Sequence, residues 1–190
     1  NPFVLVEYAR LFEDGGDLGA LLTEPHPPAA VHDVLTRRVD RLPDETVRLL
    51  RTASVVGRDF DLETLSRVTG VAEDDVLDGL DPALAAGLVL DVGADRFRFA
   101  HALVRDTVYA GLSPSRRSRT HRLVAEVLHD VPGRQTEVAR HWFAVGPGGV
   151  DRAWRAATTA AEQARMVYAY DEAQEMLERA DELIEQDPAA

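Results

Sequence analysis

The sequence predicts a mainly α-helical chain that is interrupted by one small β-hairpin. Two observations favour this fold class. Apolar residues recur every three or four positions along most of the 190 residues, as on the buried face of an amphipathic helix. Residues 88–92 and 96–99 are instead β-prone, and Gly93-Ala94-Asp95 between them is suited to a tight connection. We therefore expect helices on both sides of a two-stranded hairpin.

The first 42 residues are predicted to be a helical tail and a linker. Residues 3–12 have the apolar spacing of a short amphipathic helix, and a stretch rich in glycine and proline follows them. A further helix is expected over residues 29–42, where Leu35 and Val39 belong to a series of apolar residues at helical spacing.

Three short helices are predicted next, over residues 43–56, over residues 62–68 and from about residue 73. Pro43 starts the first of them and is followed by two acidic residues, which are favourable at the positive end of a helix dipole. Gly70 is placed to close the second. Three helices and then a hairpin is the order of a winged helix, a relative of the helix-turn-helix motif. We therefore predict a winged-helix-like domain over residues 43–112.

Pro82 conflicts with the pattern of the helix that begins near residue 73, which is the fourth helix counted from residue 29. A proline in a helix interior removes a backbone donor and crowds the preceding turn, at a cost of about 3 kcal/mol. The helix therefore either kinks at Pro82 or ends near Leu80, and we favour an end near Leu80. Asp81 would then cap a second short helix that runs to Gly87.

The chain after the hairpin is predicted to be entirely helical, with helices over residues 101–112, 115–131, 136–145, 152–168 and 170–186. The last two carry small residues where two helices must approach closely, and the positions are Ala157, Ala161, Ala164, Ala173, Leu177 and Ala180. This pattern resembles a tetratricopeptide unit, whose period is about 34 residues. One such unit cannot bury its own apolar face. We therefore predict that residues 113–190 are a helical region that enters tetratricopeptide-like repeats.

The absence of two residue types excludes several kinds of chemistry. All 21 basic side chains are arginine, so the chain lacks the lysine of a P-loop, of a kinase or of a Schiff base. Cysteine is also absent, which removes disulfides, thiolate metal sites and thiol nucleophiles. No signal segment opens the chain, and no apolar run approaches the roughly 20 residues of a membrane span. We expect a cytoplasmic protein with no membrane partner.

No catalytic or metal-binding pattern is present. The six histidines form no His-x-x-x-His or His-Glu-x-x-His arrangement. Gly146-Pro147-Gly148-Gly149 lacks the lysine, the preceding buried strand and the following Ser or Thr of a phosphate loop, so we interpret it as a linker. No Gly-x-Ser-x-Gly elbow occurs, and no acidic pair stands out as a glycosidase dyad. We expect no catalytic residue, no metal and no enzymatic activity in this segment.

A winged helix suggests DNA binding. The fourth helix would be its recognition helix, so the charge of that helix decides between DNA and protein as its partner. No arginine lies between Val71 and Asp95, and the net charge of the chain is −12. Such a surface repels phosphates, which supply most non-specific DNA affinity. We therefore favour docking to protein over direct nucleic-acid binding. The acidic residues of this helix are Glu73, Asp74, Asp75, Asp78 and Asp81.

The only concentrated basic run, residues 115–122, is interpreted as the solvated face of a helix, because the apolar residues that follow it point the other way. Docking to an acidic surface, such as that of the fourth helix, is the alternative.

Several segments in a fixed order resemble the STAND-class ATPases of bacteria. They are Asn1-Pro2-Phe3, Leu42-Pro43, Val55-Val56-Gly57-Arg58-Asp59-Phe60 and Phe97-Arg98-Phe99-Ala100-His101-Ala102-Leu103-Val104-Arg105. The resemblance is strongest to the large ATP-binding LuxR-type transcriptional regulators and their cyclase-linked relatives. It implies a nucleotide-binding domain upstream, then a winged helix, then tetratricopeptide-like repeats that carry the sensing function.

The resemblance also implies two nucleotide contacts. Pro2 matches the proline of a Gly-x-Pro motif that packs on the adenine ring. His101 matches the histidine of a Met-His-Asp motif that touches the β-phosphate of ADP, although Ala100 and Ala102 replace its neighbours. From the residues alone, His101 stands at a strand-to-helix junction, where it either faces a phosphate or caps the helix. No cofactor is expected in this segment, and ATP or ADP would bind with the upstream domain.

Three hypotheses follow from these observations. The first is a non-catalytic regulatory segment of a STAND-type regulator, whose partners are the upstream nucleotide-binding domain and an effector or partner protein on the helical repeats. The regulatory arm of a cyclase-linked ATPase is a variant of it. The second is a stand-alone winged-helix DNA-binding regulator with a helical dimerisation tail. The third is a small-molecule hydrolase, which needs a site that the sequence does not display.

Overall fold

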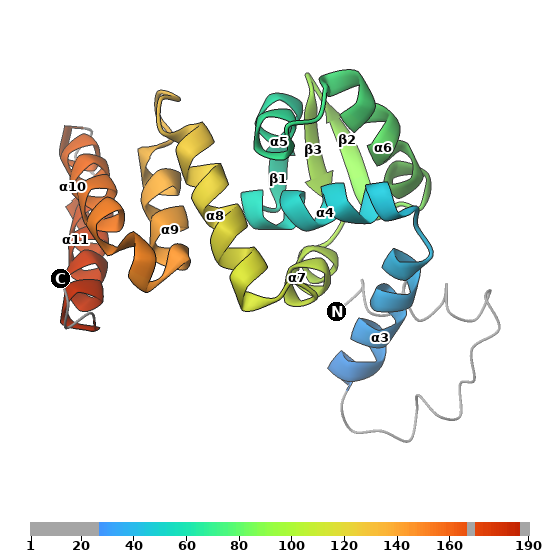
Figure 1. Cartoon of the computed structure of the whole chain (residues 1–190), viewed down its shortest axis with the longest axis horizontal. Helices are drawn as coiled ribbons and strands as arrows, with labels where there is room; N and C mark the ends of the chain where they lie inside the picture. Colours follow the sequence, from blue (N-terminus) through green and yellow to red (C-terminus); the bar gives the residue numbers. More distant parts are fainter. Residues whose placement is uncertain (1–26, 167–169, 187–190) are drawn as a thin grey trace. The chain divides into compact units, whose positions relative to one another are not determined.

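The computed structural model of the chain describes residues 27–166 and 170–186 (Figure 1). These residues form a mainly helical protein with one small three-stranded sheet. They group into two compact units. The first holds the described residues up to Phe60 together with Asp74–Gly111, and the second holds Asp61–Glu73 together with the described residues from Leu112.

The first unit is built from helices and the sheet. Its helices are α3 (Pro27–Asp40), α4 (Asp44–Val56), nearly all of α6 (Glu73–Ala85) and α7 (Ala102–Ala110). Helix α4 begins directly after Pro43 with Asp44 and Glu45 in its first turn, as predicted. Arg105 of α7 donates from its Nε to the carbonyl oxygen of Ser54 at 2.7 Å, which fixes α7 on α4.

The sheet consists of β1 (Asp59–Asp61), β2 (Val89–Gly93) and β3 (Arg96–Phe99), with β3 in the centre. The predicted hairpin is confirmed, since β2 and β3 pair antiparallel with Val89 opposite Phe99. Its turn is made by Ala94 and Asp95, which both have positive φ, at 52° and 58°. This geometry matches the right-handed twist of the two strands.

Strand β1 was not predicted from the sequence. It is only three residues long, too short to show an alternating pattern. The backbone N–H of Phe99 donates to the carbonyl oxygen of Arg58 at 2.9 Å, next to this strand. Phe60 on β1 is buried, and its ring centroid lies 5.7 Å from that of Phe97 and 5.6 Å from that of Phe99. An aromatic cluster therefore fills the core beneath the sheet.

The predicted break at Pro82 is wrong, because α6 runs without interruption from Glu73 to Ala85. Val76, Leu80 and Ala83 on its inner face are fully buried. Their burial offsets the hydrogen bond that proline cannot donate. The helix ends at Ala85, two residues before Gly87, which has a φ of 64°.

The second unit contains α5 (Leu62–Thr69), α8 (Pro114–Leu128), α9 (Gln135–Val145), a 3-10 turn η1 (Pro147–Gly149), α10 (Val150–Met166) and α11 (Tyr170–Gln186). Helices α8, α9, α10 and α11 pack consecutively, and α5 packs on α8 (Figure 1). Asp61 caps α5 by accepting from the N–H of Thr64 at 2.7 Å. Gly70, with a φ of 70°, closes α5 as predicted.

Small residues line the contact between α10 and α11. Ala157, Ala161 and Ala164 of α10 are buried, and so is Ala180 of α11. The side chain of Ala173 lies outside the described residues. Leu177 was predicted to share this contact but is 41% exposed, and Met176 is fully buried in its place. Met176 and Ala180 are four residues apart and therefore share one face of α11.

The grouping of the chain crosses one predicted boundary. Residues 61–73, which include α5, group with the second unit, although they lie inside the predicted 43–112 domain. The predicted helix over residues 3–12 and the candidate residue Pro2 lie outside the described residues. Among the helices that the structure describes, none has the length and apolar character needed to cross a membrane.

Candidate functional site

His101 lies in the first unit, directly before α7. Its backbone is extended, with a φ of −141°, and its carbonyl oxygen accepts the N–H of Val104 at 3.1 Å. Its half-buried side chain makes no capping hydrogen bond to the helix, so capping does not account for this residue. The position at a strand-to-helix junction agrees with the prediction. The N-terminus of α7 presents backbone donors and positive potential at this point.

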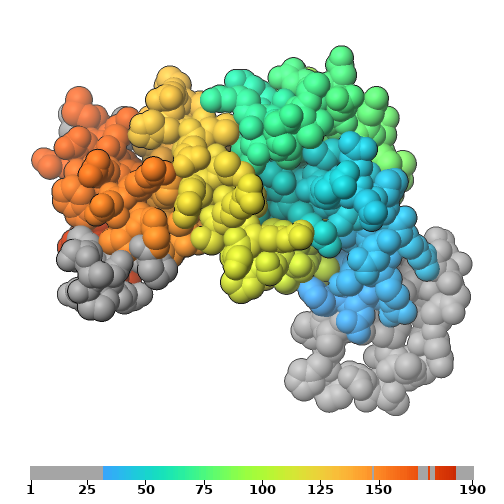
Figure 2. All heavy atoms as spheres, viewed as in Figure 1, coloured from blue at the N-terminus to red at the C-terminus, as the bar shows by residue number. Residues whose placement is uncertain are grey.

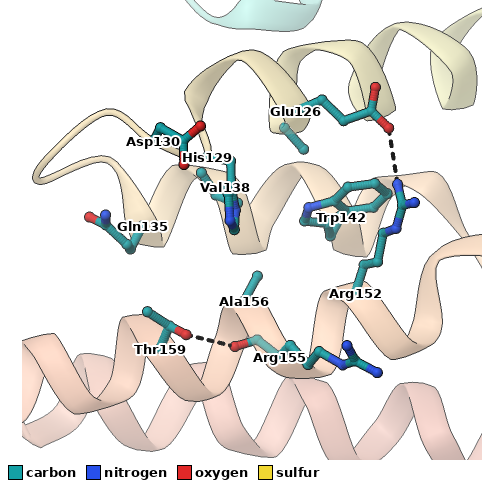
Figure 3. A pocket seen from close by; sticks show the side chains of 11 residues that line it. Glu126, His129, Asp130, Gln135, Val138, Trp142, Arg152, Arg155, Ala156 and Thr159 are labelled. Atoms are coloured by element: carbon teal, nitrogen blue, oxygen red, sulfur yellow. Dashed lines mark hydrogen bonds and ion pairs between the residues drawn. The ribbon is translucent and has the colours of Figure 1, made fainter.

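The second unit contains a pocket between α8, α9 and α10 (Figure 3). Its volume of about 600 Å³ lies within the usual range for small-molecule sites. Buried apolar side chains form one side of it, namely Ala125, Val138 and Trp142. Polar and charged side chains surround this apolar part. Figure 2, which draws all heavy atoms, shows α8, α9 and α10 (yellow to orange) packed side by side within the second unit.

A guanidinium and a carboxylate make a fixed wall at one end of the pocket. Arg152 Nη1 contacts Glu126 Oε1 at 3.0 Å, and the guanidinium carbon lies 4.9 Å from the centre of the Trp142 ring. The ion pair is exposed, so we assign it little stability of its own. Its effect is geometric, because pairing and stacking together hold Arg152 over the indole.

Gln135, the first residue of α9, supplies an unsatisfied polar atom. Its Oε1 atom is buried and has no hydrogen-bond partner among the described residues. Its Nε2 atom makes a long 3.5 Å hydrogen bond to the carbonyl oxygen of Val131. A buried acceptor without a partner is costly to the folded state.

Two further charges line the pocket without a charged partner. Neither Asp130 nor Arg155 forms an ion pair within the described part of the chain. In Figure 3, Asp130 lies at the same end as Gln135, and the side chain of Arg155 runs toward the end where Arg152 lies. The pocket therefore has an acceptor end and a donor end.

Two buried histidines face each other elsewhere in the second unit. The Nδ1 atoms of His121 on α8 and His141 on α9 are 2.8 Å apart, and both side chains are only 7% exposed. One Nδ1 must carry a proton and the other must not for this hydrogen bond to exist. The sequence separates the two residues by twenty positions, so no local motif indicated their pairing.

Acid should destabilise the second unit through this pair. When both rings are protonated, two N–H groups and two positive charges face each other in a buried site, whereas the unfolded chain takes up both protons freely. The unfolded state then binds more protons, so the free energy of unfolding falls as the pH falls. We expect a loss of roughly 1–3 kcal/mol on acidification, because the buried hydrogen bond cannot form when both rings are protonated. Urea unfolding followed by tryptophan fluorescence measures it.

Two variants test the origin of this effect. Replacing both His121 and His141 with leucine should remove this part of the pH dependence. His129→Gln is the matched control, because His129 is exposed. An equally steep pH dependence in the double variant would contradict the assignment.

The structure does not bring the sequence-predicted candidates together with the pocket. His101 belongs to the first unit, and the pocket lies wholly within the second. The pocket residues were missed because they come from three helices and the turn after α8, and they carry no shared motif. Among the described residues, no group of three or more acidic or histidine side chains is placed to hold a metal ion.

Comparison with known proteins adds no identification. No protein-family model matches the chain, and neither a curated protein nor a solved structure is significantly similar to it.

Proposed function

We propose that this chain is a non-catalytic regulatory segment of a STAND-type, ATP-dependent transcriptional regulator. In this proposal residues 43–112, which combine most of the first unit with α5, are a winged-helix-like module that responds to the nucleotide state of an ATPase domain in the same protein. The second unit is a tetratricopeptide-like platform that receives an effector or a partner protein. Nucleotide and effector favour different arrangements of the same domains, which makes the mechanism a population shift.

The charge of α6 is the observation that carries this proposal. The helix follows α4 and α5 and precedes the hairpin, which is the place of a recognition helix in a winged helix. Its acidic side chains are all exposed and no basic residue accompanies them. A DNA-reading helix needs donors for phosphates and base edges, so this helix is suited to docking on a protein. The acidic residues are Glu73, Asp74, Asp75, Asp78 and Asp81.

The second unit supports the sensing part of the proposal. Its helices pack in consecutive hairpins, which is the arrangement of a helical-repeat platform. The pocket between α8, α9 and α10 offers an apolar surface, and its Asp130 and Arg155 side chains form no ion pair with any residue that the structure describes. No pair of side chains in it has the nucleophile and base arrangement of a hydrolase, so ligand binding without turnover fits the residues better.

ADP binding to a longer chain that includes the ATPase domain tests the proposal. We expect ADP to bind, and we expect His101→Ala to weaken its affinity about tenfold or more, because a hydrogen bond to a charged phosphate is lost. Isothermal titration calorimetry with ADP and with ATP measures the difference.

Arg119→Ala is the control for this experiment, because Arg119 is exposed, belongs to the second unit and does not line the pocket. It should leave the affinity unchanged. If His101→Ala also leaves ADP affinity unchanged, the residue has no nucleotide role and the proposed coupling loses its main contact.

A further inference from the structure

The two ends of the pocket in the second unit differ in charge and in hydrogen-bonding capacity. Asp130 and Gln135 lie at one end, and Trp142 and Arg152 lie at the other (Figure 3). The inference that follows rests on the proposed function, in which the second unit receives an effector.

The acceptor end is suited to a cationic donor. The Asp130 carboxylate is exposed and has no ion-pair partner among the described residues, and the buried Oε1 atom of Gln135 accepts no hydrogen bond there. An ammonium group carries several N–H donors and a positive charge, so it can pair with the Asp130 carboxylate.

The donor end is suited to a carboxylate. Arg152 is already engaged by Glu126 and by the face of Trp142. Arg155, one turn further along α10, has a guanidinium without an acidic partner in the described ranges. A guanidinium presents parallel N–H donors that match the two oxygens of a carboxylate.

The middle of the pocket is apolar. Val138 and Trp142 are buried at its floor, and Ala156 is half-buried opposite them. Such a surface favours an uncharged, apolar body between the two charged groups. The volume of about 600 Å³ is more than a single charged group needs.

From these features we infer that the pocket binds a short peptide with a free amino terminus and a free carboxyl terminus. The amino terminus contacts Asp130, the carboxyl terminus contacts Arg155, and the apolar side chains of the peptide lie against Val138 and Trp142. Peptides of this class are the effector of the second unit.

Three forms of one probe test the inference on the 190-residue chain. The probe is the tripeptide alanyl-leucyl-alanine with free ends, with an acetylated amino end, or with an amidated carboxyl end. Calorimetry should detect the free form in the millimolar range or tighter. Each blocked form should bind about tenfold more weakly, because one charge-assisted hydrogen-bonding group is lost.

Two variants assign each end of the peptide. Asp130→Asn should weaken the free form about tenfold and leave the acetylated form no weaker than before. Arg155→Gln should weaken the free form about tenfold and leave the amidated form no weaker than before. The matched controls are Asp181→Asn and Arg119→Gln, which change exposed charges outside the pocket and should leave binding unaltered.

Equal binding of free and blocked peptides would overturn the inference, and so would the absence of binding at millimolar concentration. Equal losses in the control variants would also overturn it, since the effect would then be one of net charge. The proposed function fails separately. Peptide binding without any effect on ADP affinity in the longer chain would contradict the coupling and support the peptide site. If His101→Ala changes ADP affinity but no peptide binds, the nucleotide contact is supported and the peptide site is contradicted.

Discussion

Replacing Phe99 with alanine should lower the free energy of unfolding of the first unit by about 3–5 kcal/mol. Phe99 is the largest of the fully buried side chains, and its ring packs against Phe60. The substitution removes apolar contacts and leaves a cavity beneath β3, in a unit whose sheet has only three strands. Urea unfolding followed by circular dichroism measures the loss.

The position of the tryptophans helps to localise the effect of Phe99→Ala. Trp142 and Trp154 both lie in the second unit, so their fluorescence follows that unit. The control is Leu90→Ala on the neighbouring strand β2, where the side chain is 46% exposed and the expected change is within about 0.5 kcal/mol. A similar loss in both variants would show that burial at Phe99 does not govern the stability of the sheet.

Replacing Pro82 with alanine should stabilise the first unit by about 1–2 kcal/mol. An alanine restores the N–H that can donate to the carbonyl oxygen of Asp78 and relieves crowding in that turn, a gain of up to about 3 kcal/mol. The more flexible unfolded chain takes back about 0.4–1 kcal/mol of this gain. The midpoint of urea unfolding reports the net change.

Pro43→Ala is the matched proline control for this prediction. Pro43 stands before α4, with a φ of −54° that suits proline, and its substitution should lower stability by about 0.4–1 kcal/mol. If Pro82→Ala leaves stability unchanged or lowers it, α6 has adapted to its proline, and the assumed helical cost does not apply.

Local signals predicted most of the fold. Pro43 with two acidic residues marked the start of α4, Gly70 marked the end of α5, and the hairpin was indicated by its β-prone strands. These features depend on a few neighbouring residues, so they can be read from the sequence. Strand β1 could not be, because three residues acquire their pairing only from a strand almost forty positions later.

Features set by packing were predicted less well. The interruption at Pro82 was expected from propensity, but burial of Leu80 and Ala83 keeps α6 continuous. Whether Leu177 or Met176 faces α10 depends on how α11 is rotated about its own axis, and the spacing of apolar residues does not fix that rotation. The candidate pocket was missed entirely, since a charge such as Arg155 shows its lack of a partner only when its neighbours in space are known.

The grouping of α5 with the second unit changes how the chain can be divided. The polypeptide leaves the first unit after Phe60, returns at Asp74 and leaves again after Gly111, so three covalent crossings join the two units. A cut after Gly111 does not release the second unit intact. Helix α5 would remain on the N-terminal fragment, whereas α8, on which it packs, would be on the C-terminal fragment. Any movement of one unit against the other would require backbone changes at all three connections. Three connections restrict such movement more than a single flexible linker does.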